Sequence, residues 1–182
     1  MAYLIDMSDI SREREFATGC LVWIIRERNP DLWLEFLNAP QQNEDSDEEP
    51  DQSFQVDINQ AMSSYGRIYE AINTYAVNHI EVIEAKYRSF FTVHRDLADP
   101  HIKNFMELVS RYAYGLYEKP FTYEIIIVFC AHLSVFGYMS YQAKGLQEVV
   151  KYAISSITYM LKYYGFDNSK YTELRLFAEN FF

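Results

Sequence analysis

The four histidines are the side chains best suited to acid–base chemistry or metal binding, and they are His79, His94, His101 and His132. His94 and His101 flank Asp96 and Asp99, an arrangement that suggests a metal site. The spacing matches no zinc motif, however, and Pro100 lies within it. His132 falls in an apolar run, where we expect a hydrogen-bonded core histidine and not a ligand. The sequence therefore predicts no metal site.

No catalytic motif stands out elsewhere in the chain. It has no nucleophile elbow, no glycine-rich phosphate loop and no paired-carboxylate signature. Alternating acids at 45–51 resemble a calcium loop, but Pro50 stands where that loop needs glycine and Val56 where it needs a bidentate acid. Cys20 and Cys130 both fall in apolar runs, where thiols are usually buried, reduced and inert. We therefore expect no catalytic residues, no cofactor and no enzymatic activity.

An acidic segment at about 38–56 interrupts the apolar pattern of the chain. Its centre, 44–51, has six acids and no base, so like charges repel one another and keep the segment solvated. Ser46 stands among these acids and is a candidate phosphosite, although a purely solvating loop explains the same residues. The net charge of −10 argues against binding to nucleic acid or to anionic lipid. We therefore expect a mobile acidic loop here.

The stretch 121–139 is the most informative part of the chain. From Ile125 to Met139 it has no charged residue, so a helix formed here has no polar face to present to water. A helix that is apolar all round must lie inside a protein or a membrane. Fifteen uncharged residues fall short of the roughly 20 that span a bilayer. We therefore predict a buried central helix and no membrane insertion.

Apolar residues at three- and four-residue spacing predict further helices on both sides of the central one. They are expected from Ser8 or Ser11 to Asn29, from 58 to about 87 with a bend near 75–78, from 100 to about 115, from 146 to 165, and from Asn168 or Ser169 onward. Nothing alternates at the two-residue period of a strand. The sequence therefore predicts one all-α domain, 1–182, with seven or eight helices.

Two of these helices have more apolar surface than a single core face requires. Leu21–Ile25 is apolar on every side of the first helix, and the 146–165 helix has a stripe of tyrosines and serines besides its core row. Tyrosines mixed with small hydroxyls suit a partly wet protein interface. We predict a partner or two-fold dimer interface made of Leu21, Ile25, Tyr152, Ser155, Tyr159 and Tyr163. The alternative is that the tyrosines only cover the edge of the core.

Three short motifs, in their order and spacing, resemble the poxvirus Bcl-2-like proteins. Trp23–Asn29 is similar to the aromatic-Arg-Asn ending of their first helix, and Ser64–Glu70 resembles their Gly-Arg-Leu-Tyr/Phe second helix. Phe121–Glu124, followed by an apolar run with Cys130 and Ala131, is similar to the start of their central helix. The likeness covers most of the chain outside the acidic segment. It implies a Bcl-2-like bundle around 121–139.

The resemblance also implies a function. Most of these proteins are non-enzymatic virulence factors of the host cell cytoplasm. They bind adaptors or kinases and block signalling from Toll-like and interleukin-1 receptors toward NF-kappaB or interferon regulatory factors. Several form dimers through their first and sixth helices. A smaller group blocks mitochondrial apoptosis by holding pro-apoptotic helices in a surface groove.

The start of the central helix favours the signalling inhibitors. Death inhibitors of the cellular type have Asn-Trp-Gly-Arg at that place, and the arginine pairs with an aspartate of the ligand. This chain has Phe121–Glu124 instead, and an acid there would repel the aspartate. We therefore expect an inhibitor of innate immune signalling that binds host proteins, with inhibition of apoptosis as the alternative.

Overall fold

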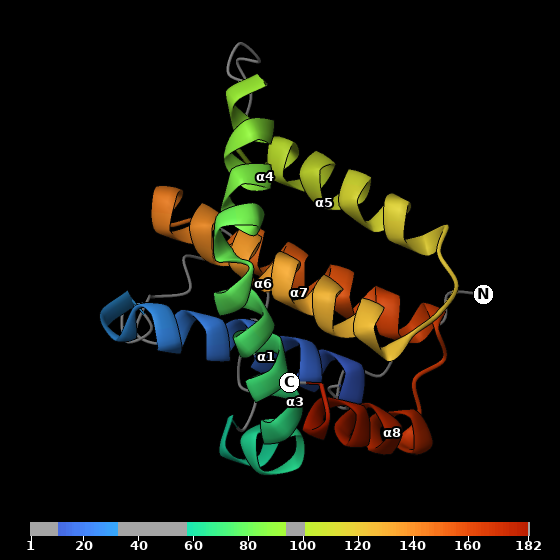
Figure 1. The fold of residues 1–182 in the computed structure, drawn as a ribbon. Helices are drawn as coiled ribbons and strands as arrows, with labels where there is room; N and C mark the ends of the chain where they lie inside the picture. Colours follow the sequence, from blue (N-terminus) through green and yellow to red (C-terminus); the bar gives the residue numbers. More distant parts are fainter. Residues whose placement is uncertain (1–10, 33–57, 94–100, 182) are drawn as a thin grey trace, which may run out of the picture.

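All regular secondary structure in the described residues is helical. The computed structural model describes residues 11–32, 58–93 and 101–181. Its helices are α1 (Arg12–Arg28), α3 (Ile58–Asn78), α4 (Ile80–Val93), α5 (His101–Tyr117), α6 (Tyr123–Lys144), α7 (Gln147–Tyr163) and α8 (Asn168–Glu179) (Figure 1). The all-α prediction is therefore confirmed for these residues. The acidic segment at 38–56 with Ser46, and the group His94, Asp96 and Asp99, lie outside the described residues.

α6 is the central helix of the bundle. It packs against α1, α3, α4, α5 and α7. Figure 1 shows α6 and α7 side by side, with the run of α3 and α4 crossing them. Of the 22 residues of α6, 14 are buried, so the helix has no continuous face toward water. The structure thus contains the buried central helix that the charge-free stretch predicts.

Local chemistry determines where α6 begins and ends. Thr122 caps its start, because the hydroxyl oxygen accepts a hydrogen bond from the Ile125 N–H at 3.2 Å. Gly145 ends it with a left-handed φ of 66°, and its N–H donates to the carbonyl of Tyr141 at 2.7 Å. The helix therefore continues past the predicted boundary at 139. Its last turn includes the exposed and charged Lys144, which lies beyond the charge-free run.

Among the described residues, α6 is the one helix long and apolar enough to cross a membrane. Length alone therefore does not distinguish it from a membrane span, contrary to the expectation from 15 uncharged residues. Its most apolar window is 72% buried by the surrounding helices. This burial accounts for the apolar composition of α6.

α1 lies against α3, α6 and α7, so helices of the same chain cover both of its apolar faces. Leu21 is 1% exposed and Ile25 is 0% exposed. The prediction that these two residues contribute to a partner or dimer interface is therefore wrong. α1 does have more apolar surface than one core face requires, but this surface packs against other helices of the same bundle.

Two glycines allow α1 to approach its neighbours closely. A Cβ atom at Gly19 would lie 2.1 Å from the hydroxyl oxygen of Tyr69. A Cβ at Gly137 of α6 would lie 3.0 Å from a methyl group of Leu21. The fully buried Tyr69 donates a hydrogen bond to the carbonyl of Phe16 at 3.3 Å. Small residues at these two positions therefore make room for a large ring and a branched side chain.

Side-chain caps determine other helix starts. Ser11 caps α1, which is one of the two positions predicted. α8 is capped by Asp167, whose carboxylate accepts a hydrogen bond from the Lys170 N–H at 2.9 Å. The predicted caps at Asn168 or Ser169 are therefore wrong, because both residues already lie within the helix.

Candidate functional site

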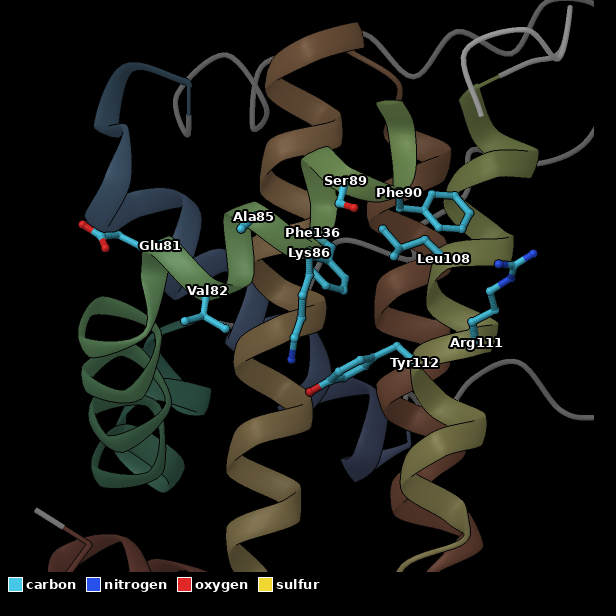
Figure 2. Close-up of a pocket in the computed structure, with 10 residues that line it drawn as sticks. All are labelled: Glu81, Val82, Ala85, Lys86, Ser89, Phe90, Leu108, Arg111, Tyr112 and Phe136. Carbon is cyan, nitrogen blue, oxygen red and sulfur yellow. The ribbon is translucent and has the colours of Figure 1, made fainter. Parts of the chain in front are cut away.

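An apolar groove lies between α4 and α5, with α6 beneath it (Figure 2). Its volume is about 840 Å³. It is lined by Glu81, Val82, Ala85, Lys86, Ser89, Phe90, Leu108, Arg111, Tyr112 and Phe136. Along α4 the lining extends from 81 to 90, which corresponds to about 13 Å at 1.5 Å per residue. The groove is therefore long enough for about two and a half turns of a helix.

The walls and floor of the groove combine exposed and buried apolar groups. Val82 is 54% exposed on the α4 wall, although it is an aliphatic residue. Phe136 is completely buried and Leu108 nearly so, and both are part of the hydrophobic core. An apolar side chain that enters between the walls would therefore contact exposed apolar atoms such as those of Val82, above a base closed by the core, as in the binding of an amphipathic helix.

A lysine on α4 extends toward the base of the groove. Figure 2 shows the side chains of Lys86 and Tyr112 pointing toward each other across the gap between α4 and α5. The Lys86 ammonium lies 5.6 Å from the centre of the Tyr112 ring, within the range of a cation–π contact. It also lies 3.4 Å from Nε2 of His132, which is 2% exposed on α6. The ammonium therefore has two contacts that hold it in place.

His132 is a hydrogen-bonded core histidine, as the sequence predicts. Its Nδ1 donates to the carbonyl of Val128 at 2.8 Å, so the neutral ring presents a lone pair on Nε2 to Lys86. Burial lowers the pKa of His132 from 6.5 to about 4, and the charge of Lys86 acts in the same direction, whereas the bond to Val128 opposes it. His132 is therefore neutral at physiological pH and accepts a hydrogen bond from the ammonium.

Two further charged groups line the groove. Arg111 of α5 forms an ion pair with Glu107 one turn earlier, and its guanidinium lies 5.6 Å from the centre of the Phe90 ring. Glu81 stands at the opposite end of the lining on α4. The groove is therefore apolar at its floor and has charges of both signs along its walls.

The α7 residues of the predicted interface form a second surface together with α5. Tyr159 and Tyr163 are 61% and 58% exposed, and Tyr114 of α5 is 68% exposed. A hollow of about 460 Å³ between the two helices is lined in part by Tyr152, Ser155 and Tyr159. We call this surface the tyrosine face, and its members are Tyr114, Tyr117, Tyr152, Ser155, Tyr159 and Tyr163.

The tyrosine face differs from the predicted interface in its second helix. The predicted interface combines α7 with the first helix. α1 does pack against α7, but its apolar residues Leu21 and Ile25 are buried there, and the exposed surface of α7 continues onto α5 instead. The ring of Tyr117 lies 4.8 Å from that of Tyr163, measured between centroids. Tyr152 is only partly exposed and packs on Phe105, which agrees in part with the alternative that tyrosines cover the core edge.

One Ser–His contact exists in the described part of the chain, and it is closed to substrate. Ser140 Oγ lies 3.0 Å from Nε2 of His101 and 2.7 Å from the hydroxyl of Tyr87. Ser140 has no exposed surface. The three side chains therefore satisfy one another's hydrogen bonds between α4, α5 and α6, and the serine hydroxyl does not reach a ligand.

Residues 11–32, 58–93 and 101–181 contain no cluster of three potential metal ligands. His101, which the sequence places near Asp99, is engaged with Ser140. Cys20 and Cys130 are both buried free thiols, as predicted. Burial raises the pKa of Cys20, and a hydrogen bond with Cys130 acts in the same direction, so the thiol form is favoured.

The groove has almost no signature in the sequence. One residue hints at it: Val82 is aliphatic but does not lie on the helix face formed by Ile80, Ile83 and Tyr87, which packs on the core. Lys86 gave no signal, because a lysine on the outer face of a helix is ordinary.

Comparison of the chain with protein-family models, with curated proteins and with solved structures finds no match.

Proposed function

We propose that this protein is a non-enzymatic inhibitor that binds host proteins through the α4–α5 groove. The observation that supports this most strongly is the groove itself, which has an apolar floor and the length of about two and a half helical turns. The occupant is an amphipathic helix of the partner. Its apolar side chains enter between the α4 wall at Val82 and the α5 wall at Leu108.

We also propose that the fold is Bcl-2-like and that the protein is related to the poxvirus proteins whose motifs it resembles. Its proposed site of action is the host cell cytoplasm. The arrangement of α1, α3, α4, α5 and α7 around the buried α6 supports this proposal. So do the places of the motifs, since Ser64–Glu70 lies within α3 and Phe121–Glu124 leads into α6.

Innate immune signalling toward NF-kappaB or interferon regulatory factors is the pathway that we propose first. The resemblance points to it, and Glu124 supports it. This acid is exposed at the start of α6, where death inhibitors of the cellular type have the arginine that pairs with a ligand aspartate. The chain lacks that arginine, and with it the main contact by which such inhibitors select their ligands.

Inhibition of mitochondrial apoptosis is the second candidate, and the groove favours it. Glu124 is not among the residues that line the groove, so its charge does not face a docked helix there. The lining contains Lys86 and Arg111 instead. A bound helix with an acid on its apolar face would therefore lie near Lys86 or Arg111, which come from α4 and α5 and not from the start of α6.

We propose the tyrosine face as a second contact surface, for a host protein or for a second copy of the chain. Its exposed rings at Tyr114, Tyr159 and Tyr163 support this, because tyrosine is enriched in interfaces. A homodimer would then use α5 and α7, since Leu21 and Ile25 of α1 are buried.

The Val82→Arg variant tests the groove. A charged side chain on the apolar wall should lower the affinity for a partner roughly tenfold or more, without loss of folding because Val82 is exposed. Binding is measured by calorimetry of the full-length protein against a panel of pro-apoptotic helical peptides. Val77→Arg is the matched control: Val77 is 55% exposed against 54% for Val82, but it does not line the groove.

A reporter for NF-kappaB activation in cells separates the two pathways. Inhibition of the reporter by the wild type and by Val77→Arg, but not by Val82→Arg, supports the signalling pathway. Nanomolar peptide binding with an unaffected reporter supports the apoptotic pathway. Equal behaviour of the two arginine variants in both assays contradicts the proposed function.

A further inference from the structure

The hollow of the tyrosine face is lined by aromatic rings and by short side chains. Its described lining consists of four tyrosines, three serines, Val109 and Ala113, and none of these residues is charged. The α4–α5 groove, in contrast, has Glu81, Lys86 and Arg111 in its lining. A charged group that entered the hollow would lose water without meeting a counter-ion, which is unfavourable. The lining therefore favours an uncharged occupant.

Two of the tyrosine rings are held in place by their neighbours. Tyr152 packs edge-on against Phe105, with centroids 6.3 Å apart, and its hydroxyl lies 3.5 Å from Oγ of Ser110. Tyr117 packs edge-on against Tyr159, also at 6.3 Å between centroids. Rings that are already ordered lose little side-chain entropy when a ligand packs on them.

The exposed hydroxyls of the hollow indicate which backbone conformation suits it. Tyr114 and Tyr159 are 68% and 61% exposed, and neither hydroxyl is hydrogen-bonded to another residue in the described part of the chain. Both are therefore available as donors. An α-helix satisfies most of its carbonyl groups within its own backbone, whereas a polyproline II segment has no internal hydrogen bonds and its carbonyls accept from outside groups. Hydroxyl donors beside aromatic rings thus favour a polyproline II ligand.

The spacing of the rings on α7 agrees with this conformation. Tyr152 and Tyr159 are seven residues apart on one helix, which corresponds to about 10 Å at 1.5 Å per residue. A polyproline II helix advances about 3.1 Å per residue, so side chains three residues apart lie on the same side and about 9 Å from each other. Two prolines at this spacing can therefore each pack on one of the two rings.

We propose that the hollow between α5 and α7 binds an uncharged, proline-rich segment of a partner protein in the polyproline II conformation. Prolines three residues apart pack on Tyr152 and Tyr159, and the Tyr114 hydroxyl donates to a carbonyl of the segment. This inference rests on the tyrosine face that is proposed above as a contact surface. It does not depend on what binds in the α4–α5 groove.

The test measures binding of a fluorescein-labelled deca-proline peptide to the protein by fluorescence anisotropy. Tyr159→Ala should weaken this binding about tenfold or more, and Tyr159→Phe, which keeps the ring and loses one hydrogen bond, about threefold. Tyr163→Ala is the matched control, because Tyr163 is 58% exposed on the same helix but does not line the hollow. Its affinity should stay within about twofold of the wild type. A flexible decapeptide of alternating glycine and serine should bind at least about tenfold more weakly than deca-proline.

Other outcomes would overturn the inference. If deca-proline does not bind, or if Tyr159→Ala binds it like the wild type, the proline-rich occupant is refuted, while the α4–α5 groove is judged separately by helical peptides and Val82→Arg. If Val82→Arg weakens deca-proline binding instead, the peptide lies in the groove, and the role of the tyrosine face is refuted. A wild-type dimer that Tyr159→Ala dissociates in sedimentation, without peptide binding, would show that a second copy covers the hollow.

Discussion

The Ile25→Asp variant is expected to lose about 4 kcal/mol or more of its free energy of unfolding, a large part of the stability of a domain of this size. Ile25 is completely buried on α1, where α3, α6 and α7 surround the helix. The substitution removes the packing of a branched side chain and places a carboxylate where it meets no partner. Urea unfolding of the purified variant measures the loss.

Leu176→Asp is the matched control. Leu176 is an aliphatic residue on α8 that is 51% exposed, so its replacement by an acid should change the stability by no more than about 0.5 kcal/mol. If Ile25 belonged to an interface between molecules, the variant would fold normally and only its oligomeric state would change. Unchanged unfolding together with a shift in sedimentation would therefore contradict the burial of α1.

The stability of the protein is expected to fall as the pH decreases from 7.5 to 5, by about 2 kcal/mol from His132 alone. The pKa of His132 is lowered from 6.5 to about 4 in the folded chain, chiefly by burial. As the pH falls through 6.5, the unfolded chain binds a proton that the folded chain does not bind until the pH nears 4. The unfolded state therefore gains stability over this interval, and the folded state is most stable above it.

Comparison with the His132→Gln variant isolates this contribution. Burial also lowers the pKa of His101, which acts in the same direction, but His101 is present in both proteins. The free energy of unfolding, measured in urea at several pH values, should therefore depend less on pH in the variant. Parallel curves for the two proteins between pH 7.5 and 5 would show that His132 is not a buried neutral group.

The burial of the central helix was predictable because its sequence offers no polar face to water. A charge-free run with no polar face must lie inside a protein or a membrane, and the structure surrounds α6 with five helices. The cap at Ser11 was predictable for a local reason too, since a hydroxyl before a helical pattern satisfies free N–H groups. Features that depend on a few adjacent residues were thus accessible from the sequence.

The environment of α1 was not predictable in the same way. Its pattern shows how much apolar surface must be covered, but not whether the same chain or a partner covers it. The answer depends on how closely α1 approaches its neighbours. That distance is set by Gly19 against Tyr69 and by Gly137 against Leu21, which are pairs of residues far apart in the sequence.

The groove was inaccessible for a related reason. Whether α4 and α5 pack together or leave a groove between them depends on the distance and angle between the two helices, and no local pattern encodes these. Lys86 looks like an ordinary exposed lysine in the sequence. Its contact with His132, 46 residues later, is visible only in the structure.

Hydrogen exchange of the full-length protein, free and with a pro-apoptotic helical peptide from the binding panel added in excess, tests the central claim that partners dock between α4 and α5. Opening of these helices becomes less frequent when a ligand spans them, so their amides should exchange more slowly in the complex. We predict added protection at 82–90 and 108–112, and none at 152–163. Protection confined to 152–163, with no change in α4 and α5, would contradict the account.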